Sequence, residues 1–122
     1  MNITLNDWLF QLCDTESPDT SIAAYHFGLF ETAHGYEIYL IGSKEFDEED
    51  SDWACNVDFE PVNKYFPLTQ EEYRNVGWEK ILERIISELS AFVRTEKFAT
   101  SFFSKAEAVS TGFDDGDLVR IV

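Results

Sequence analysis

The amino-acid sequence predicts a single α+β domain over residues 1–122, in which an antiparallel sheet packs on one main amphipathic helix. Two apolar segments, 22–30 and 36–41, flank a short turn, and a long stretch from Trp78 repeats apolar residues at helical spacing. Near the C-terminus, Asp115-Gly116 lies between two apolar runs, which is a strong hairpin signal. We expect a three-strand meander plus a C-terminal hairpin, and the order α-β-β-β-α-β-β is typical of the α+β class.

The N-terminal residues predict a short amphipathic helix over 5–13. Thr4 is a suitable N-cap, and Asp7 follows in the first turn, where the helix dipole favours an acidic side chain. The polar residues 14–20 that come next have the composition of a loop. The apolar stripe of the predicted helix contains Leu5, Trp8, Leu9 and Leu12.

The next three segments, at 22–30, 36–41 and 53–59, have the alternation of apolar and polar residues that is typical of strands. The alternation is clearest in the third, whereas the second face of the first is less polar. We expect a sheet with one core face and one face that carries carboxylates among aromatic rings. The predicted core face contains Tyr25, Phe27, Leu29, Tyr36, Ile38, Leu40, Trp53, Cys55, Val57 and Phe59. The opposite face contains Ala24, His26, Gly28, Phe30, Glu37, Tyr39, Ile41, Asp52, Ala54, Asn56, Asp58 and Glu60.

After the third predicted strand, Glu60-Pro61 ends the ladder, because proline cannot donate a backbone hydrogen bond. Residues 62–67 are expected to form an ordered connection. Thr69 and Glu72 form a capping box, which predicts a short helix that begins at about Gln70.

The main helix is expected from Trp78 to about Thr95, with its apolar stripe on the core face of the sheet. Residues 96–105 fit either a continued helix or a buried turn. Residues 106–113 and 118–122 are expected as two strands around the turn 114–117. The stripe of the main helix contains Trp78, Ile81, Leu82, Ile85, Leu89, Phe92 and Val93.

The charge of the chain is strongly negative and unevenly distributed. The net charge is −15, from 24 Asp and Glu against 9 Lys and Arg. Residues 1–60 contain 14 of the acids and a single base, Lys44, whereas residues 61–122 contain 10 acids and 8 bases. A field of this sign attracts basic surfaces and repels nucleic acids and anionic membranes, so we expect neither of the latter as a partner. The alternative is that the acidity only keeps a small protein soluble.

Composition and cysteine usage indicate a folded protein of a reducing compartment. Hydrophobic residues make up 44% of the chain and aromatic residues 16%, which excludes a disordered chain. Cys13 and Cys55 lie far apart within apolar patterns and are expected to be buried thiols, although a disulfide between them stays open. The first residues lack a basic segment followed by an apolar stretch, so we expect no secretory signal, and no run in the sequence approaches the ~20 apolar residues that span a membrane. We expect a cytoplasmic protein of undetermined oligomeric state.

Two acidic turns are candidate metal sites. The turn 47–52 is rich in carboxylates but lacks the glycine and the ligand spacing of a calcium loop. The turn 114–117 is rich in aspartate and glycine, which a tight turn also requires. Because solvated turns explain both segments, we predict no metal ligand and no cofactor.

The sequence contains no catalytic signature. Of the two histidines, His34 lies beside Gly35 in a predicted turn, and His26 lies on the wetter face of its strand, where it can hydrogen-bond a carboxylate. A nucleophilic set of Cys55, His26 and Asp58 can be written, but the alternation places Cys55 and Asp58 on opposite faces. We predict no catalytic residue and no enzymatic activity.

The polar face of the predicted sheet, together with the acidic turn, is the candidate partner-binding surface. Tyrosine among carboxylates is typical of a surface that binds a basic protein, because the ring supplies contact area and the acids steer association. An ordinary exposed sheet face is the alternative. The candidate residues are Glu37, Tyr39, Asp47, Glu48, Glu49, Asp50, Asp52, Asn56, Asp58 and Glu60.

Several segments carry a family resemblance: Gly28-Leu-Phe-Glu31, Gly35-Tyr-Glu-Ile-Tyr-Leu-Ile-Gly42, Asp50-Ser-Asp-Trp-Ala-Cys55, the Trp-led helix from Trp78, and Gly112-Phe-Asp-Asp-Gly-Asp-Leu118. Together they resemble small acidic immunity proteins of bacterial polymorphic-toxin and contact-dependent inhibition systems. The resemblance spans most of the chain, lies in general character, and assigns no functional residue. It implies a cytoplasmic bacterial protein that blocks a cognate toxin, commonly a basic nuclease.

The leading hypothesis is therefore a non-enzymatic acidic protein that neutralises a basic protein partner such as a toxin. One alternative is a domain that binds a metal ion or small molecule through the turns 47–52 and 114–117. Another is a general interaction or oligomerisation domain that uses a sheet edge.

Overall fold

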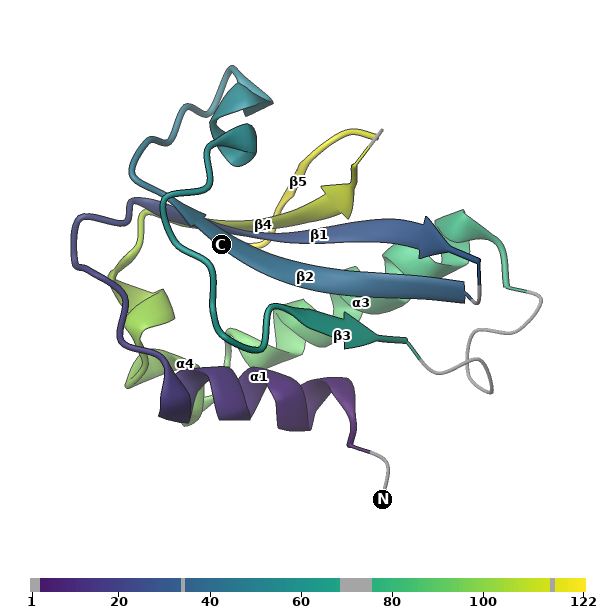
Figure 1. The fold of residues 1–122 in the computed structure, drawn as a ribbon, viewed down its shortest axis with the longest axis horizontal. Coiled ribbons are helices and arrows are strands. Elements are labelled where there is room, and N and C mark those ends of the chain that lie inside the picture. The colour runs from purple at the N-terminus through teal and green to yellow at the C-terminus, as the bar shows by residue number, and fades with distance from the viewer. Residues whose placement is uncertain (1–2, 34, 69–75, 115) are drawn as a thin grey trace.

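The computed structural model describes residues 3–33, 35–68, 76–114 and 116–122. The described strands form one sheet of five in the order β3-β2-β1-β4-β5. The helices α1, α3 and α4 lie on one face of this sheet, and the loop that contains η1 rises on the opposite face (Figure 1). The α+β class is confirmed. The elements in chain order are α1 (Leu5–Thr15), β1 (Ala24–Thr32), β2 (Gly35–Ser43), η1 (Ser51–Cys55), β3 (Tyr65–Pro67), α3 (Trp78–Phe92), α4 (Glu96–Ala99), η2 (Phe102–Lys105), β4 (Ala108–Phe113) and β5 (Val119–Arg120).

The sheet is mixed, which corrects the expected antiparallel meander plus separate hairpin. β1 is the central strand, antiparallel to β2 and parallel to β4. After β3 the chain crosses the helical face through α3 and α4, so β4 returns beside β1 in the same direction. Because β1 has a neighbour on each side and covered faces, its sequence is apolar almost throughout.

The predicted third strand over 53–59 is wrong. Ser51–Cys55 form the 3-10 helix η1, and Phe59 makes only an isolated bridge to Gly42. The Asp50 side chain accepts a hydrogen bond from the Asp52 amide at 3.0 Å, which starts the helical turn in place of a strand. The third strand of the sheet is β3, within the segment that was expected to be a connection.

The side chains of residues 53–59 also depart from the predicted alternation. Trp53 is buried, but against Ala24 and Ala108 on the face opposite the helices and not on the predicted core face. Cys55 and Val57 are exposed, and Phe59 is half-buried. In β3 the Phe66 ring stacks on Trp8 of α1 at a centroid distance of 5.7 Å and pairs with Ile38 of β2. Pro67 is tolerated because β3 is an edge strand.

The first helix, the main helix and the final hairpin form where the sequence predicts them. Thr4 and Asp7 make the reciprocal bonds of a capping box at the start of α1. α3 begins at Trp78, but it ends at Phe92, earlier than expected. Trp78 is 54% exposed, so it does not belong to the buried stripe, which contains Ile81, Ile85, Leu89 and Phe92.

The ambiguous segment 96–105 resolves into two short helices, α4 and η2. Their rings Phe98 and Phe103 are buried in the main core and stack on each other. β4 and β5 pair antiparallel, which confirms the final hairpin. The short helix expected from Gln70 lies outside the described residues, as does His34.

Candidate functional site

The outer face of the sheet, opposite the helices, contains two rows of small residues in register. Ala24 of β1 lies beside Ala108 of β4, and Gly28 lies beside Gly112. One large side chain lies over each row, because the small residues leave the space. Trp53 is buried against Ala24 and Ala108, and the Tyr39 ring lies over Gly28.

Glycine is required at Gly28 because of the approach of Tyr39. A Cβ atom at this position would lie 2.0 Å from Cζ of the Tyr39 ring. In the register of the sheet, Gly28 pairs with Tyr39 on one side and Gly112 on the other. The ring of Tyr39 therefore lies in a trough across β1, and its hydroxyl reaches the end of β4.

Trp53 holds the acidic segment 45–60 on this face. Its side chain is 4% exposed and contacts the Phe46 ring at a centroid distance of 5.4 Å. Segment 45–60 contains eight carboxylates and no base. Trp53 therefore anchors a segment with a dense set of charges, of which Asp47, Glu48, Glu49, Asp50 and Asp52 are all exposed.

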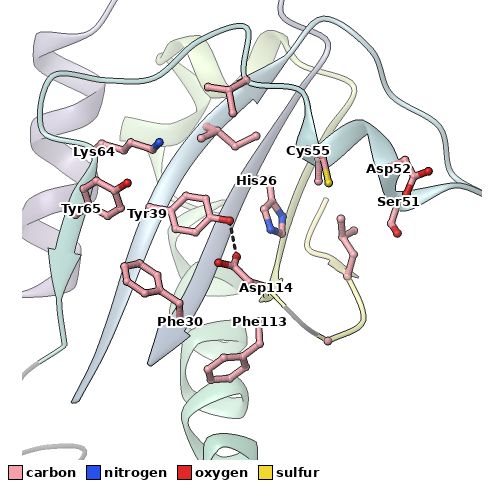
Figure 2. Close-up of a pocket in the computed structure, with 15 residues that line it drawn as sticks. His26, Phe30, Tyr39, Ser51, Asp52, Cys55, Lys64, Tyr65, Phe113 and Asp114 are labelled. Carbon is pink, nitrogen blue, oxygen red and sulfur yellow. Dashed lines mark hydrogen bonds between the residues drawn. The ribbon is translucent and has the colours of Figure 1, made fainter. Parts of the chain in front are cut away.

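A cleft of about 690 Å³ lies between the acidic segment, β3 and the β4–β5 hairpin. We call it the Tyr39 cleft, and Figure 2 shows Tyr39 near its centre, between Lys64 and Asp114. Its lining residues are His26, Phe30, Tyr39, Ile41, Ser51, Asp52, Ala54, Cys55, Val57, Lys64, Tyr65, Phe113, Asp114, Gly116 and Leu118.

Hydrogen bonds and ion pairs hold the polar groups of the Tyr39 cleft. The Tyr39 hydroxyl donates to Asp114 Oδ1 at 2.6 Å. Burial, together with this bond and the charge of Asp114, raises the pKa of Tyr39. Lys64 Nζ lies 2.9 Å from Glu60 Oε2, and this contact raises the pKa of Lys64. The phenol and the ammonium group are therefore both protonated at neutral pH.

His26 forms part of the floor of the Tyr39 cleft as a neutral ring. It is 6% exposed, and its Nδ1 lies 2.9 Å from Ser110 Oγ. Burial lowers the pKa of His26 to about 4, against the smaller opposite effect of Asp114. The expectation of a wet position bonded to a carboxylate is thus wrong, because the ring is buried and its Nδ1 contacts the hydroxyl of Ser110.

The structure does not assemble the nucleophilic set that the sequence allows. Asp58 accepts a hydrogen bond from the Lys44 amide at 2.8 Å and does not line the Tyr39 cleft. Cys55 does line it together with His26, so the expectation that Cys55 is a buried thiol on the core face is wrong. Both cysteines are free thiols, Cys13 half-buried and Cys55 exposed.

Most of the predicted partner-binding carboxylates have local partners. Glu48 and Glu60 form ion pairs with Arg120 and Lys64. Asp47 and Asp50 accept hydrogen bonds from nearby backbone amides, and Asn56 Nδ2 donates to Glu45 at 3.0 Å. Of the predicted partner-binding carboxylates, Glu37, Glu49 and Asp52 make no side-chain hydrogen bond or ion pair within the described part of the chain.

The two predicted acidic turns lie near each other. Asp47, Glu48 and Glu49 line a second cleft, of about 530 Å³, together with Asp117 and Arg120. Arg120 pairs with Glu48 inside it. Among the residues that the structure describes, which omit Asp115, no group of three or more His, Cys, Asp or Glu is arranged to hold a metal ion.

No known protein family, curated protein or solved structure matches the chain. The helices of the described ranges are all too short or too polar to cross a membrane.

Sequence reasoning missed Lys64, Tyr65 and Asp114 as members of one site. Tyr65 reaches Tyr39 through the β2–β3 pairing, and Asp114 does so through the parallel pairing of β1 with β4. Neither pairing was predicted. The available signal was the pair of glycines inside strand patterns, which often marks a close approach of another group.

Proposed function

We propose that this chain is a non-enzymatic acidic binding protein of the cytoplasm that sequesters a basic protein partner, as an immunity protein neutralises a toxin. The observation that carries the proposal is the acidic segment 45–60, which has eight carboxylates and no base and is held on the outer face of the sheet by Trp53. Anchored charges of one sign favour a partner of the opposite sign. The two free thiols support a reducing compartment.

The internal ion pairs of this surface leave it available to a partner. Glu48 and Glu60 are bonded to Arg120 and Lys64, but the side chains of Glu48 and Glu60 are 69% and 57% exposed. Exposed pairs of this kind contribute about 0–1 kcal/mol each. Exchanging such a pair for a pair with a partner's arginine or lysine therefore costs little.

The charge distribution also gives the proposal a kinetic signature. Electrostatic steering raises association rates at low salt and is screened beyond about 10 Å at 0.1 M ionic strength. We expect the association rate with the partner to fall steeply with added salt, while the dissociation rate changes less.

Differential capture tests the proposal. The wild type and two charge-reversed variants serve as bait in extracts of the native cells. In Glu49→Lys/Asp52→Lys the reversed charges lie in the acidic segment, and in Glu79→Lys/Glu83→Lys they lie on exposed positions of α3. Both variants change the net charge by the same amount. The proposal requires a basic protein that the wild type and the α3 variant retain and the acidic-segment variant loses. Equal retention by all three baits would refute it.

The toxin-neutralising form of the proposal makes a further demand. The captured protein, expressed alone, should inhibit growth, and co-expression of the wild type should restore it. Co-expression of Glu49→Lys/Asp52→Lys should not. Growth inhibition that neither variant nor wild type relieves would leave a binding protein without an immunity function.

A further inference from the structure

We infer that the Tyr39 cleft receives an arginine side chain of the basic partner. This inference rests on the proposed function and deepens it, because it names the contact that selects one basic residue over another. The acidic segment attracts the partner at long range, whereas the Tyr39 cleft supplies aromatic surface and a fixed carboxylate at short range.

The wall of the Tyr39 cleft is a cluster of three aromatic rings, and a cation lies over two of them. Phe30, Tyr39 and Tyr65 contact one another at centroid distances between 5.9 and 6.2 Å. Lys64 Nζ lies 5.7 Å from the Tyr39 centroid and 5.3 Å from that of Tyr65. A cation of the chain itself therefore already lies over the Tyr39 and Tyr65 rings, at distances at which cation–π attraction operates.

The charges around the Tyr39 cleft also favour a positively charged occupant. Two carboxylates line it, Asp52 and Asp114. The Tyr39 hydroxyl holds Asp114 in place through one carboxylate oxygen. The basic residues of the cleft do not offset these two negative charges, because Glu60 neutralises Lys64 and His26 is uncharged at neutral pH. The balance is negative beside an aromatic wall.

Arginine fits this combination better than lysine. Its planar guanidinium stacks on aromatic rings and offers several donors to a carboxylate, whereas the compact ammonium of lysine is strongly hydrated. The rim is open to a protruding side chain, since Tyr65 is 49% exposed and Val57 is 52% exposed. Exposed aromatic and apolar atoms at the mouth of a polar cleft are typical of a contact surface.

The test compares hexa-arginine and hexa-lysine peptides by titration calorimetry at fixed ionic strength. The wild type should bind hexa-arginine more tightly by about threefold to tenfold, the range of one cation–π contact. Asp114→Asn and Tyr65→Leu should each bring the two affinities close together. Asp117→Asn is the matched control: it removes the same charge from the same hairpin, but Asp117 does not line the Tyr39 cleft.

A second variant should act in the opposite direction. Glu60→Gln/Lys64→Met keeps the net charge but removes the internal cation from the Tyr39 and Tyr65 rings. Affinity for hexa-arginine should then rise by about threefold, because the ring faces become free. A gain of affinity is not explained by a damaged fold.

The outcomes separate this inference from the proposed function. Wild type without a preference for arginine, or a preference that survives both Asp114→Asn and Tyr65→Leu, overturns the inference and leaves the acidic surface in place. If Glu49→Lys, whose side chain lies outside the Tyr39 cleft, binds both peptides as the wild type does, the proposed function fails instead. An arginine preference that Asp114→Asn and Tyr65→Leu remove and Asp117→Asn retains supports the inference.

Discussion

Replacing Trp53 by alanine should release the acidic segment and destabilise the domain. Trp53 is 4% exposed and lies over Ala24 and Ala108, whose small side chains belong to paired strands and cannot move to fill the space. Truncation of a buried tryptophan typically costs about 3–5 kcal/mol. Since natural domains are stable by about 5–15 kcal/mol, this loss is a large fraction of the total.

Urea unfolding measures this loss, and Trp78→Ala is the matched control. Trp78 is 54% exposed and makes a ring contact with Phe113, so we expect its truncation to cost about 1 kcal/mol. The difference between the two variants isolates the effect of burial at Trp53, because both lose the same side chain.

Hydrogen exchange distinguishes global destabilisation from local release. The Gly42 amide donates to the Phe59 carbonyl at 2.8 Å, and the Phe59 amide donates to Gly42 at 3.1 Å. If the segment detaches while the core stays folded, both amides should exchange faster in Trp53→Ala than in Trp78→Ala. Equal stability losses in the two variants together with unchanged exchange at Gly42 and Phe59 would refute the anchoring role of Trp53.

Three further predictions concern the same face and the thiols. Gly28→Ala should displace the Tyr39 ring and break its hydrogen bond to Asp114, which should lower the free energy of unfolding in urea by about 1–3 kcal/mol. Gly77→Ala should cost much less, because a Cβ atom at Gly77 meets nothing within 4 Å. Equal costs in the two variants would contradict the close contact between Gly28 and Tyr39. Relative to His26→Gln, the wild type should lose about 3 kcal/mol of stability as the pH falls from 6.5 to about 4. The reason is that His26 binds a proton in the unfolded chain at a higher pH than in the folded chain. Parallel curves of stability against pH for the two proteins would show that His26 is not buried as a neutral ring. Iodoacetamide should alkylate Cys55 well before Cys13, because Cys55 is exposed and burial raises the pKa of Cys13. Mass spectrometry of peptides measures the order of alkylation, and the reverse order would contradict the burial of Cys13.

The elements that the sequence predicts well are those whose signals are local. The capping box of Thr4 and Asp7 and the stripe behind it lie within one short segment, and α1 forms there. The same holds for α3, whose stripe from Ile81 to Phe92 needs no partner to be recognised. β1 and β2 are close in sequence, and their hairpin pairing follows from the short turn between them.

The strand pairings that were predicted wrongly depend on contacts between segments far apart in the sequence. Residues 53–59 alternate as a strand does, but the Asp50 side chain offers the backbone a helical turn, and only Trp53 finds a buried position. The place beside β2 goes to β3, since Phe66 can stack on Trp8, and Trp8 belongs to a helix at the other end of the chain. No pattern within 53–67 records that contact.

The apolar character of β1 was a usable signal for its central position. His26 and Gly28 face away from the helices, yet both are buried, because Trp53 and Tyr39 cover them. The second face of β1 is less polar than a solvated sheet face. This composition predicts that another part of the chain covers it. It does not predict whether a strand, a loop or a single ring supplies that coverage.

The observed conformation of residues 53–59 gives the outer face a different arrangement of charges from the one that a strand would give. As a strand, this segment would have spread its carboxylates flat along the sheet and mixed them with the aromatic residues. As a loop anchored through Trp53, it places the acids on a separate element beside an open trough that holds Tyr39. Attraction at long range then depends on Glu49 in the loop, selection at short range depends on Asp114 and the rings of the sheet, and Asp52 contributes to both. Because Asp52 also lines the Tyr39 cleft, we expect reversal of that one charge to alter both the association rate and the preference for arginine, whereas reversal of Glu49 alone should alter only the association rate.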